Sequence, residues 1–209
     1  MANRDLLRKR PQRAPLVRFF VYCEGLNTEP DYLETFAKHV GHRQVVLEVD
    51  TPGGIPAILR AAKKKKKELR AQNSGVGTAD QVWVVFDEDG RLAYPEEIAE
   101  CLADNINVAT SNSCFELWLI AHHSNEAPMA DQHGVRARLC ALDSSYDTTN
   151  KTINSLALMP YVEVAEANCL TALQQAKAAN APFRRGTTYV GKLTSAIRKA
   201  AAAFARKFA

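Results

Sequence analysis

Apolar and polar positions along the chain follow two different periods, and they predict strands and helices that alternate. Nearly continuous apolar runs, such as VWVVF at 82–86, are typical of strands buried on both faces of a parallel sheet. We predict strands at 16–23, 45–49, 82–86 and 107–110. Helical spacing predicts intervening helices at 29–40, 55–70 and 95–104. This alternation indicates an α/β fold, in which a parallel four-stranded sheet is flanked by helices.

The second half of the chain predicts a mostly helical extension. Residues 111–113 are expected to form a turn that caps an apolar helix. Further helices are predicted at 114–121, 135–142, 162–181 and from Gly186 onward, with a polar irregular region at 125–151. We therefore divide the chain into a disordered basic arm at 1–14, an α/β core at 15–124 and a C-terminal part at 125–209 packed on that core.

Three acids and a glycine directly follow the strand at 82–86. Asp87 and Asp89 are two residues apart, so both side chains leave the same face if the strand geometry continues. Two carboxylates at the carboxyl end of a buried strand suit a hard cation such as Mg²⁺. The alternative is a polar turn, for which Asp89-Gly90 has the appropriate residues.

Two more acids occupy comparable positions. Glu24 follows the first strand as Asp87 follows the third, and ligands of open parallel sheets bind at the carboxyl ends of strands. Glu116 lies in the first turn of the apolar helix after the fourth strand. The alternatives are an ordinary Glu-Gly turn for Glu24 and a favourable helix-dipole interaction for Glu116, worth about 0.3–1 kcal/mol.

The net charge of +4 is modest, but its distribution is informative. Basic residues gather in 4–18, 63–67 and 184–207, whereas acids concentrate between 24 and 104. An acidic centre with basic flanks suits a metal site that receives a polyanion such as DNA or RNA, although basic runs also form solvated helix faces. Candidate contacts to substrate phosphates are Lys151, Arg184, Arg185 and Lys192.

Several classes of protein do not fit the sequence. No apolar run approaches the ~20 residues that cross a bilayer, and the basic N-terminus lacks the apolar core of a signal peptide. The five cysteines are scattered without a CxxC motif, which indicates reduced thiols in a cytoplasmic protein. No GxxxxGK[ST] occurs, and the Gly-x-Gly at 75–77 follows a predicted helix and precedes a strand, which argues against a P-loop NTPase or a Rossmann cofactor.

Three segments carry a resemblance to a known family. VYCEGLNTEPDYL at 21–33, VWVVFDEDG at 82–90 and SNSCFELWLIAHH at 111–123 resemble the RloB-like proteins, which are bacterial members of the wider Toprim group. GTTYVGKL at 186–193 is similar to that family's C-terminal helix start, so the resemblance covers about residues 15–195. Ser113 departs from the expected proline, and the match around Lys151 is weak.

The resemblance implies a Toprim fold and a nuclease that uses Mg²⁺ or Mn²⁺. By motif, Asp87 and Asp89 would hold the metal, and Glu24 would act as general acid or base or bridge a second metal. Glu116 would complete the site. The Toprim resemblance implies a nuclease that cleaves DNA or RNA, with tRNA as a possible target. RloB-like proteins are associated with anti-phage defence and abortive-infection loci, often beside an ATPase, so the resemblance also implies such a role and such a partner protein. The alternatives are a non-cleaving module that binds a nucleotide or nucleic acid, and a domain whose acids are turn residues.

Overall fold

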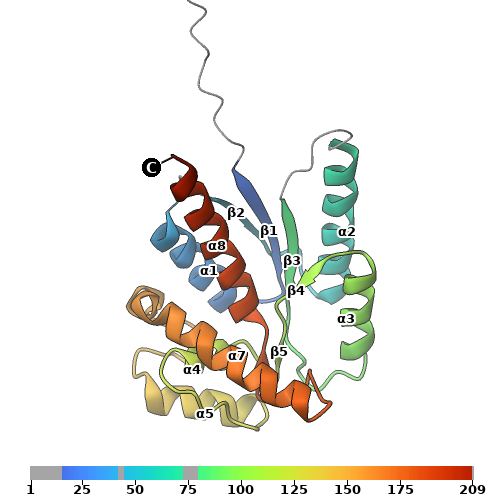
Figure 1. Ribbon diagram of the computed structural model, residues 1–209. Helices are drawn as coiled ribbons and strands as arrows, with labels where there is room; N and C mark the ends of the chain where they lie inside the picture. The colour runs from blue at the N-terminus through green and yellow to red at the C-terminus, as the bar shows by residue number, and fades with distance from the viewer. Residues whose placement is uncertain (1–15, 42–44, 73–79, 209) are drawn as a thin grey trace, which may run out of the picture.

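Four parallel strands form the centre of the protein, in the order β2-β1-β3-β4 (Figure 1). The computed structural model describes residues 16–41, 45–72 and 80–208, without the side chains of residues 207 and 208. The first half contains β1 (Val17–Cys23), α1 (Thr28–Val40), β2 (Val45–Asp50), α2 (Ile55–Gln72), β3 (Gln81–Val85), α3 (Tyr94–Ala103) and β4 (Asn107–Val108). The second half contains β5 (Ser111–Asn112), α4 (Glu116–Ala121), α5 (Gln132–Leu142), α6 (Ser155–Leu158), a 3₁₀ turn (Met159–Tyr161), α7 (Val162–Ala178), β6 (Thr187–Thr188) and α8 (Val190–Phe208).

The central strands are apolar on both faces because helices cover both faces of the sheet. Phe19 and Val21 of β1 pack in one buried cluster with α1, α4, α7 and α8. Phe20 and Tyr22 pack in a second cluster with α2 and α3. Figure 1 shows these two helical layers on either side of the sheet. A strand that buries successive residues on opposite faces must be apolar at nearly every position, which is the pattern of the sequence.

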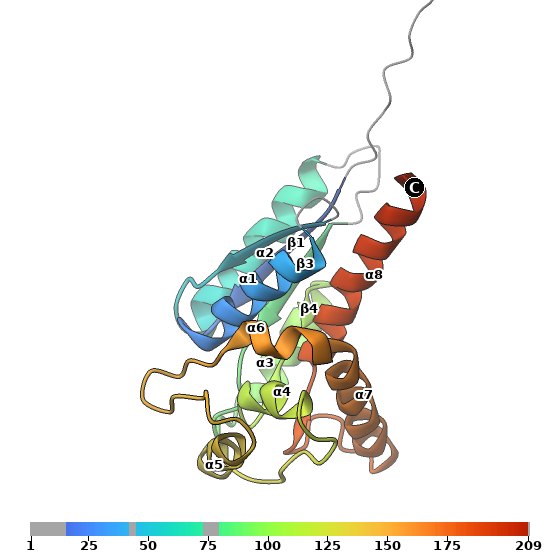
Figure 2. The same cartoon turned by 90° about the vertical axis from the view of Figure 1, so that its left-hand side faces the viewer.

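The C-terminal helix belongs to the same core as the sheet. Val190, Leu193 and Ile197 follow helical spacing and are buried in the cluster that contains β1. At the start of α8, a Cβ on Gly191 would lie 3.2 Å from both Cys169 Cβ and Trp118 Cζ3. Glycine therefore allows α8 to pass close to α4 and α7. In Figure 2, α4, α5 and α7 gather below the sheet, at the carboxyl ends of the strands.

The predicted α/β class, with a four-stranded parallel sheet and a helical C-terminal part, is confirmed. Residues 111–113 and 186–188 differ from the prediction, which expected a turn and a helix start there. Ser111–Asn112 instead pairs antiparallel with Thr187–Thr188, and Ser111 Oγ lies 2.8 Å from Thr188 Oγ1. This ribbon joins segments far apart in sequence, so it has no local signal. The predicted arm at 1–14 lies outside the described residues.

The structure also describes the state of the cysteines and the character of the helices. All five cysteines are free thiols; Cys140 is exposed, and the other four are buried. Among the helices in the described ranges, none combines the length and the apolar character that a bilayer crossing requires.

A buried histidine in the core predicts a pH dependence of stability. His122 Nε2 lies 2.9 Å from Tyr32 Oη, and its Nδ1 lies 2.9 Å from the carbonyl oxygen of Trp118. Burial, with a smaller contribution from the neighbouring His123, lowers the pKa of His122 to about 4. The unfolded chain therefore binds a proton between pH 6.5 and 4 that the folded chain does not bind. We expect this residue to lower the free energy of unfolding by about 3 kcal/mol across that window as the pH falls.

The measurement is urea unfolding of wild type and His122→Gln at several pH values. The variant lacks the titrating ring, so its stability should depend less on pH between 6.5 and 4 than that of wild type. His133→Gln removes an exposed histidine and is the matched control. Identical pH slopes for wild type and His122→Gln would contradict the prediction.

Candidate functional site

The acids that follow β1 and β3 meet at the carboxyl edge of the sheet. β1 and β3 are direct neighbours, and the Glu24 N–H donates to the Val85 carbonyl at 3.0 Å. The Asp87 N–H lies 3.4 Å from Glu24 Oε2. Parallel strands end at the same edge, so residues that follow them directly become neighbours although 63 positions separate them.

A cavity of about 410 Å³ opens at this edge, and four of the predicted site acids line it. These are Glu24, Asp87, Asp89 and Glu116. Glu29 adds a fifth carboxylate, while Arg136 and Lys151 supply positive charge. The remaining lining residues are Gly25, Leu26, Asn27, Thr28, Phe115, Thr149 and Asn150. The structure thus brings together acids that follow β1 and β3 and acids at the starts of two helices.

Glu29 is a site residue that the sequence analysis missed. It lies in the first turn of α1 with 7% of its surface exposed. Its carboxyl group lies over Gly25, where an added Cβ would come within 2.0 Å of Glu29 Oε2. Burial, together with repulsion from Glu116 and Glu24, raises the pKa of Glu29 to about 7. The available signal was an acid at the start of the helix that follows Glu24-Gly25, although such acids usually serve the helix dipole.

Asp87 and Asp89 lie in a turn that also aims them at the cavity. Asp89 has φ 46° and Gly90 has φ 73°, and the Arg91 N–H donates to the Glu88 carbonyl at 2.8 Å. The polar turn and the candidate site are therefore the same segment. Burial raises the pKa of Asp87 well above its usual value, and Glu29, Glu116 and Asp89 raise it further. A bound divalent cation would relieve this mutual repulsion, and oxygen ligands are those that Mg²⁺ prefers.

Glu116 lines the cavity, but its carboxylate already has protein partners. Oε1 accepts hydrogen bonds from Arg136 Nε at 3.1 Å and from Tyr146 Oη at 2.5 Å. Only 3% of the residue is exposed. Burial alone would raise the pKa of Glu116, but the hydrogen bonds from Tyr146 and Cys114 and the charge of Arg136 outweigh it and lower the pKa. Glu116 is therefore a charged group held in a fixed position.

Arg91 engages the carboxylate of Glu24. Its Nη1 lies 3.1 Å from Glu24 Oε1 and 3.4 Å from Oε2. Among the residues that the structure describes, no three or more His, Cys, Asp or Glu side chains are grouped so that they could hold a metal ion. The donor types at this edge fit Mg²⁺, but these side chains are not assembled into a coordination shell.

Of the four predicted phosphate contacts, Lys151 lines the acidic cavity. The loop that carries it is tied to the start of α1, because Asn27 Nδ2 donates to the Asn150 carbonyl at 3.1 Å and Thr28 Oγ1 donates to the Lys151 carbonyl. Figure 2 shows this loop between α5 and α6. Arg184 and Arg185 instead line a separate cavity of about 390 Å³ beside β6.

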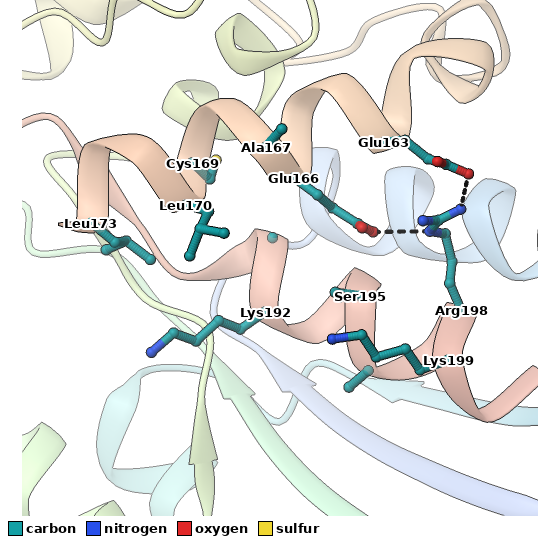
Figure 3. Close-up of a pocket in the computed structure, with 12 residues that line it drawn as sticks. Glu163, Glu166, Ala167, Cys169, Leu170, Leu173, Lys192, Ser195, Arg198 and Lys199 are labelled. Carbon is teal, nitrogen blue, oxygen red and sulfur yellow. Dashed lines mark hydrogen bonds and ion pairs between the residues drawn. The ribbon is translucent and has the colours of Figure 1, made fainter.

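Lys192 lines a third cavity, of about 470 Å³, between α7 and α8 (Figure 3). Two acids line it as well, but both are paired. Arg198 Nε lies 3.2 Å from Glu166 Oε1, and Arg198 Nη1 donates to Glu163. Both carboxylates of this cavity are therefore neutralised by one arginine. At the edge of the sheet, by contrast, burial and neighbouring acids raise the pKa values of Asp87 and Glu29.

Comparisons with known proteins identify the family. A search of curated proteins returned no match, and neither did a search of solved structures. The family model described as RloB-like protein matches residues 19–197. The match extends over nearly all of the sheet, the acidic cavity and the first part of α8, so it covers well over half of the chain. The chain belongs to the RloB-like protein family.

Proposed function

We propose that this RloB-like protein is a metal-dependent nuclease with a Toprim-type site at the carboxyl edge of its sheet. The observation that carries the proposal is the 410 Å³ cavity, into which separate elements bring five carboxylates. Burial and mutual repulsion raise the pKa values of Asp87 and Glu29. A cluster of acids that is unfavourable without a cation is typical of a site that binds one.

The proposed roles follow from the partners of each residue. Asp87 and Asp89 would hold Mg²⁺ or Mn²⁺, and Glu24 would complete the shell or move a proton. When bound, the metal supplies Lewis-acid polarisation of the scissile phosphate. Glu116 has its hydrogen bonds committed to Arg136 and Tyr146, so its role would be to hold Arg136 at the wall of the cavity. Lys151, on the opposite loop, would contact a substrate phosphate.

The proposed substrate is a nucleic acid, either DNA or RNA, with tRNA among the candidates. The basic side chains around the acidic cavity support a polyanionic substrate, because such residues attract phosphates while the acids bind the ion. The family resemblance supports a role in anti-phage defence, together with an ATPase partner protein.

A panel of nucleic acids tests the proposal. The full chain is incubated with single- and double-stranded DNA, with RNA and with tRNA, each with Mg²⁺, Mn²⁺ or EDTA. We expect cleavage of at least one substrate with a divalent ion and none with EDTA. Cleavage that persists in EDTA would contradict the metal-dependent mechanism.

A non-cleaving binding module is the second candidate function. The pair between Arg91 and Glu24 favours it, because this carboxylate is already engaged by a cation. Nucleic acid that binds the protein with Mn²⁺ but remains intact, also with the proposed ATPase partner present, would support the module over the nuclease.

The separate cavity at β6 predicts a salt-dependent contribution to binding. Arg184→Ala combined with Arg185→Ala should weaken the binding of a labelled oligonucleotide in EDTA. The negative slope of log Kobs against log salt should become shallower by about 1 to 2, as expected when one or two phosphate contacts are lost. Fluorescence anisotropy at several salt concentrations measures this. Lys38→Ala combined with Arg60→Ala removes two exposed cations from α1 and α2 as a control, and equal slope changes would contradict a specific contact.

A further inference from the structure

Arg91 follows the acidic turn and folds back onto it. Its Nη1 lies 3.1 Å from Glu24 Oε1, and its Nη2 donates to the backbone carbonyl of Asp87. The guanidinium also lies 5.6 Å from the centroid of the Phe86 ring. The exposed fractions of the two paired side chains are 26% for Arg91 and 28% for Glu24. Their attraction is therefore stronger than that of a pair in open water.

This pairing uses the carboxylate oxygens that a metal would need. Glu24 Oε1 faces Arg91, and Oε2 lies 3.4 Å from both Arg91 Nη1 and the backbone nitrogen of Asp87. A second cation placed beside the same carboxylate would be repelled by the guanidinium. The pair therefore opposes the assembly of Glu24 with Asp87 and Asp89 around one ion.

The guanidinium of Arg91 does not make all the hydrogen bonds that it could make. Arg91 Nε is buried and has no hydrogen-bond partner in the described part of the chain, and the same holds for Glu97 Oε2. Arg91 Nη2 lies 3.8 Å from that Glu97 oxygen, which is an ion-pair distance rather than a hydrogen bond. A guanidinium with incomplete hydrogen bonds loses less on release than a fully bonded one.

We propose that Arg91 is an internal counter-ion that competes with the divalent cation for Glu24. In the absence of metal, Arg91 neutralises part of the acidic cluster; when metal binds, the pair between Arg91 and Glu24 opens. This inference rests on the proposed function, since it concerns the metal of that same site. The two cations that line the cavity differ from Arg91, because Arg136 is paired with Glu116 and Lys151 lies on the opposite loop.

Mn²⁺ binding to the full chain, measured by isothermal titration calorimetry without nucleic acid, tests the competition. Arg91→Gln should bind Mn²⁺ about tenfold more tightly than wild type, within the usual range of coupling between linked sites. Lys151→Gln removes one charge from the same cavity without touching Glu24, and it should change the affinity by less than about threefold. Arg91→Lys keeps the positive charge but lacks the planar donor array of the guanidinium, so we expect a smaller gain in Mn²⁺ affinity.

A double-variant cycle separates competition from general electrostatics. In a Glu24→Gln background, Arg91→Gln should change the Mn²⁺ affinity no more than Lys151→Gln does. The inference is overturned if folded Arg91→Gln binds Mn²⁺ no better than wild type, or if its gain persists in the Glu24→Gln background. If Arg91→Gln does not fold, Arg91→Lys decides by the same criteria.

The outcome for the proposed function is read separately. Mn²⁺ binding that follows this pattern, without cleavage of any nucleic acid, would sustain the competition and reject the nuclease. Cleavage of a nucleic acid, together with an Mn²⁺ affinity of Arg91→Gln equal to that of wild type, would sustain the nuclease and reject the competition. The absence of Mn²⁺ binding in every variant would reject both.

Discussion

Asp87→Asn is expected to abolish metal-dependent cleavage while leaving the fold intact. Asp87 follows β3 at the carboxyl edge of the sheet beside Glu24, and four other carboxylates line the same cavity. A metal ion supplies several kcal/mol of charge stabilisation, so its loss should lower the cleavage rate by at least about a thousandfold. Steady-state cleavage of the preferred substrate measures this effect.

The stability of the same variant should not fall. Burial and repulsion from Glu29, Glu116 and Asp89 raise the pKa of Asp87, so its negative charge is unfavourable in the folded protein without metal. A neutral amide of similar shape removes that repulsion. We therefore expect the Tm of metal-free Asp87→Asn to equal or exceed that of wild type, as measured by circular dichroism.

Asp50→Asn is the matched control for both measurements. Asp50 ends the neighbouring strand β2, is exposed and is absent from the lining of the acidic cavity. This variant should cleave like wild type. If Asp87→Asn retains wild-type cleavage, or if Asp50→Asn loses as much activity, the site has been placed wrongly.

Arg136→Leu is expected to destabilise the protein by about 3 kcal/mol, because it leaves the buried carboxylate of Glu116 without its charged partner. Arg136 Nε lies 3.1 Å from Glu116 Oε1, and Tyr146 remains as the second donor to that oxygen. Breaking one half of a buried ion pair costs more than the pair contributes, since the remaining charge is not solvated. Urea unfolding at neutral pH measures the change.

Two further variants isolate the cause. Arg138→Leu changes an exposed arginine on the same helix and should have an effect within about 0.5 kcal/mol. Adding Glu116→Gln to Arg136→Leu removes the buried charge and should restore much of the lost stability. A double variant as unstable as Arg136→Leu alone would show that packing, rather than charge, explains the loss.

The strands were predictable because their signal is local. Phe19, Phe20 and Val21 alternate between two buried layers, so both faces of the strand had to be apolar. The convergence of Glu24 with Asp87 was also predictable, because it needs no more than parallel strands with a common carboxyl edge. The two-residue ribbon between β5 and β6 was not, since its pairing depends on where α7 and α8 lie.

The details of the site depended on contacts between distant segments. Thr28 and Lys151 are 123 positions apart, and their hydrogen bond brings the lysine loop over the acids. In the sequence, Glu29 has the features of an ordinary first-turn acid, whereas in the structure its carboxyl group is buried over Gly25. Arg184, Arg185 and Lys192 had the charge expected of phosphate contacts, but they line other cavities.

The order of apolar and polar residues alone determined the layered α/β sheet and the edge at which its acids gather, because both follow from the chain's local periodicity and from the parallel direction of the strands. The tertiary structure decided which charges meet there. Arg91 pairs with Glu24, and Arg136 pairs with Glu116. Those pairings depend on how loops and helices from separate parts of the chain cover one edge, and a burial pattern along the sequence does not contain that information.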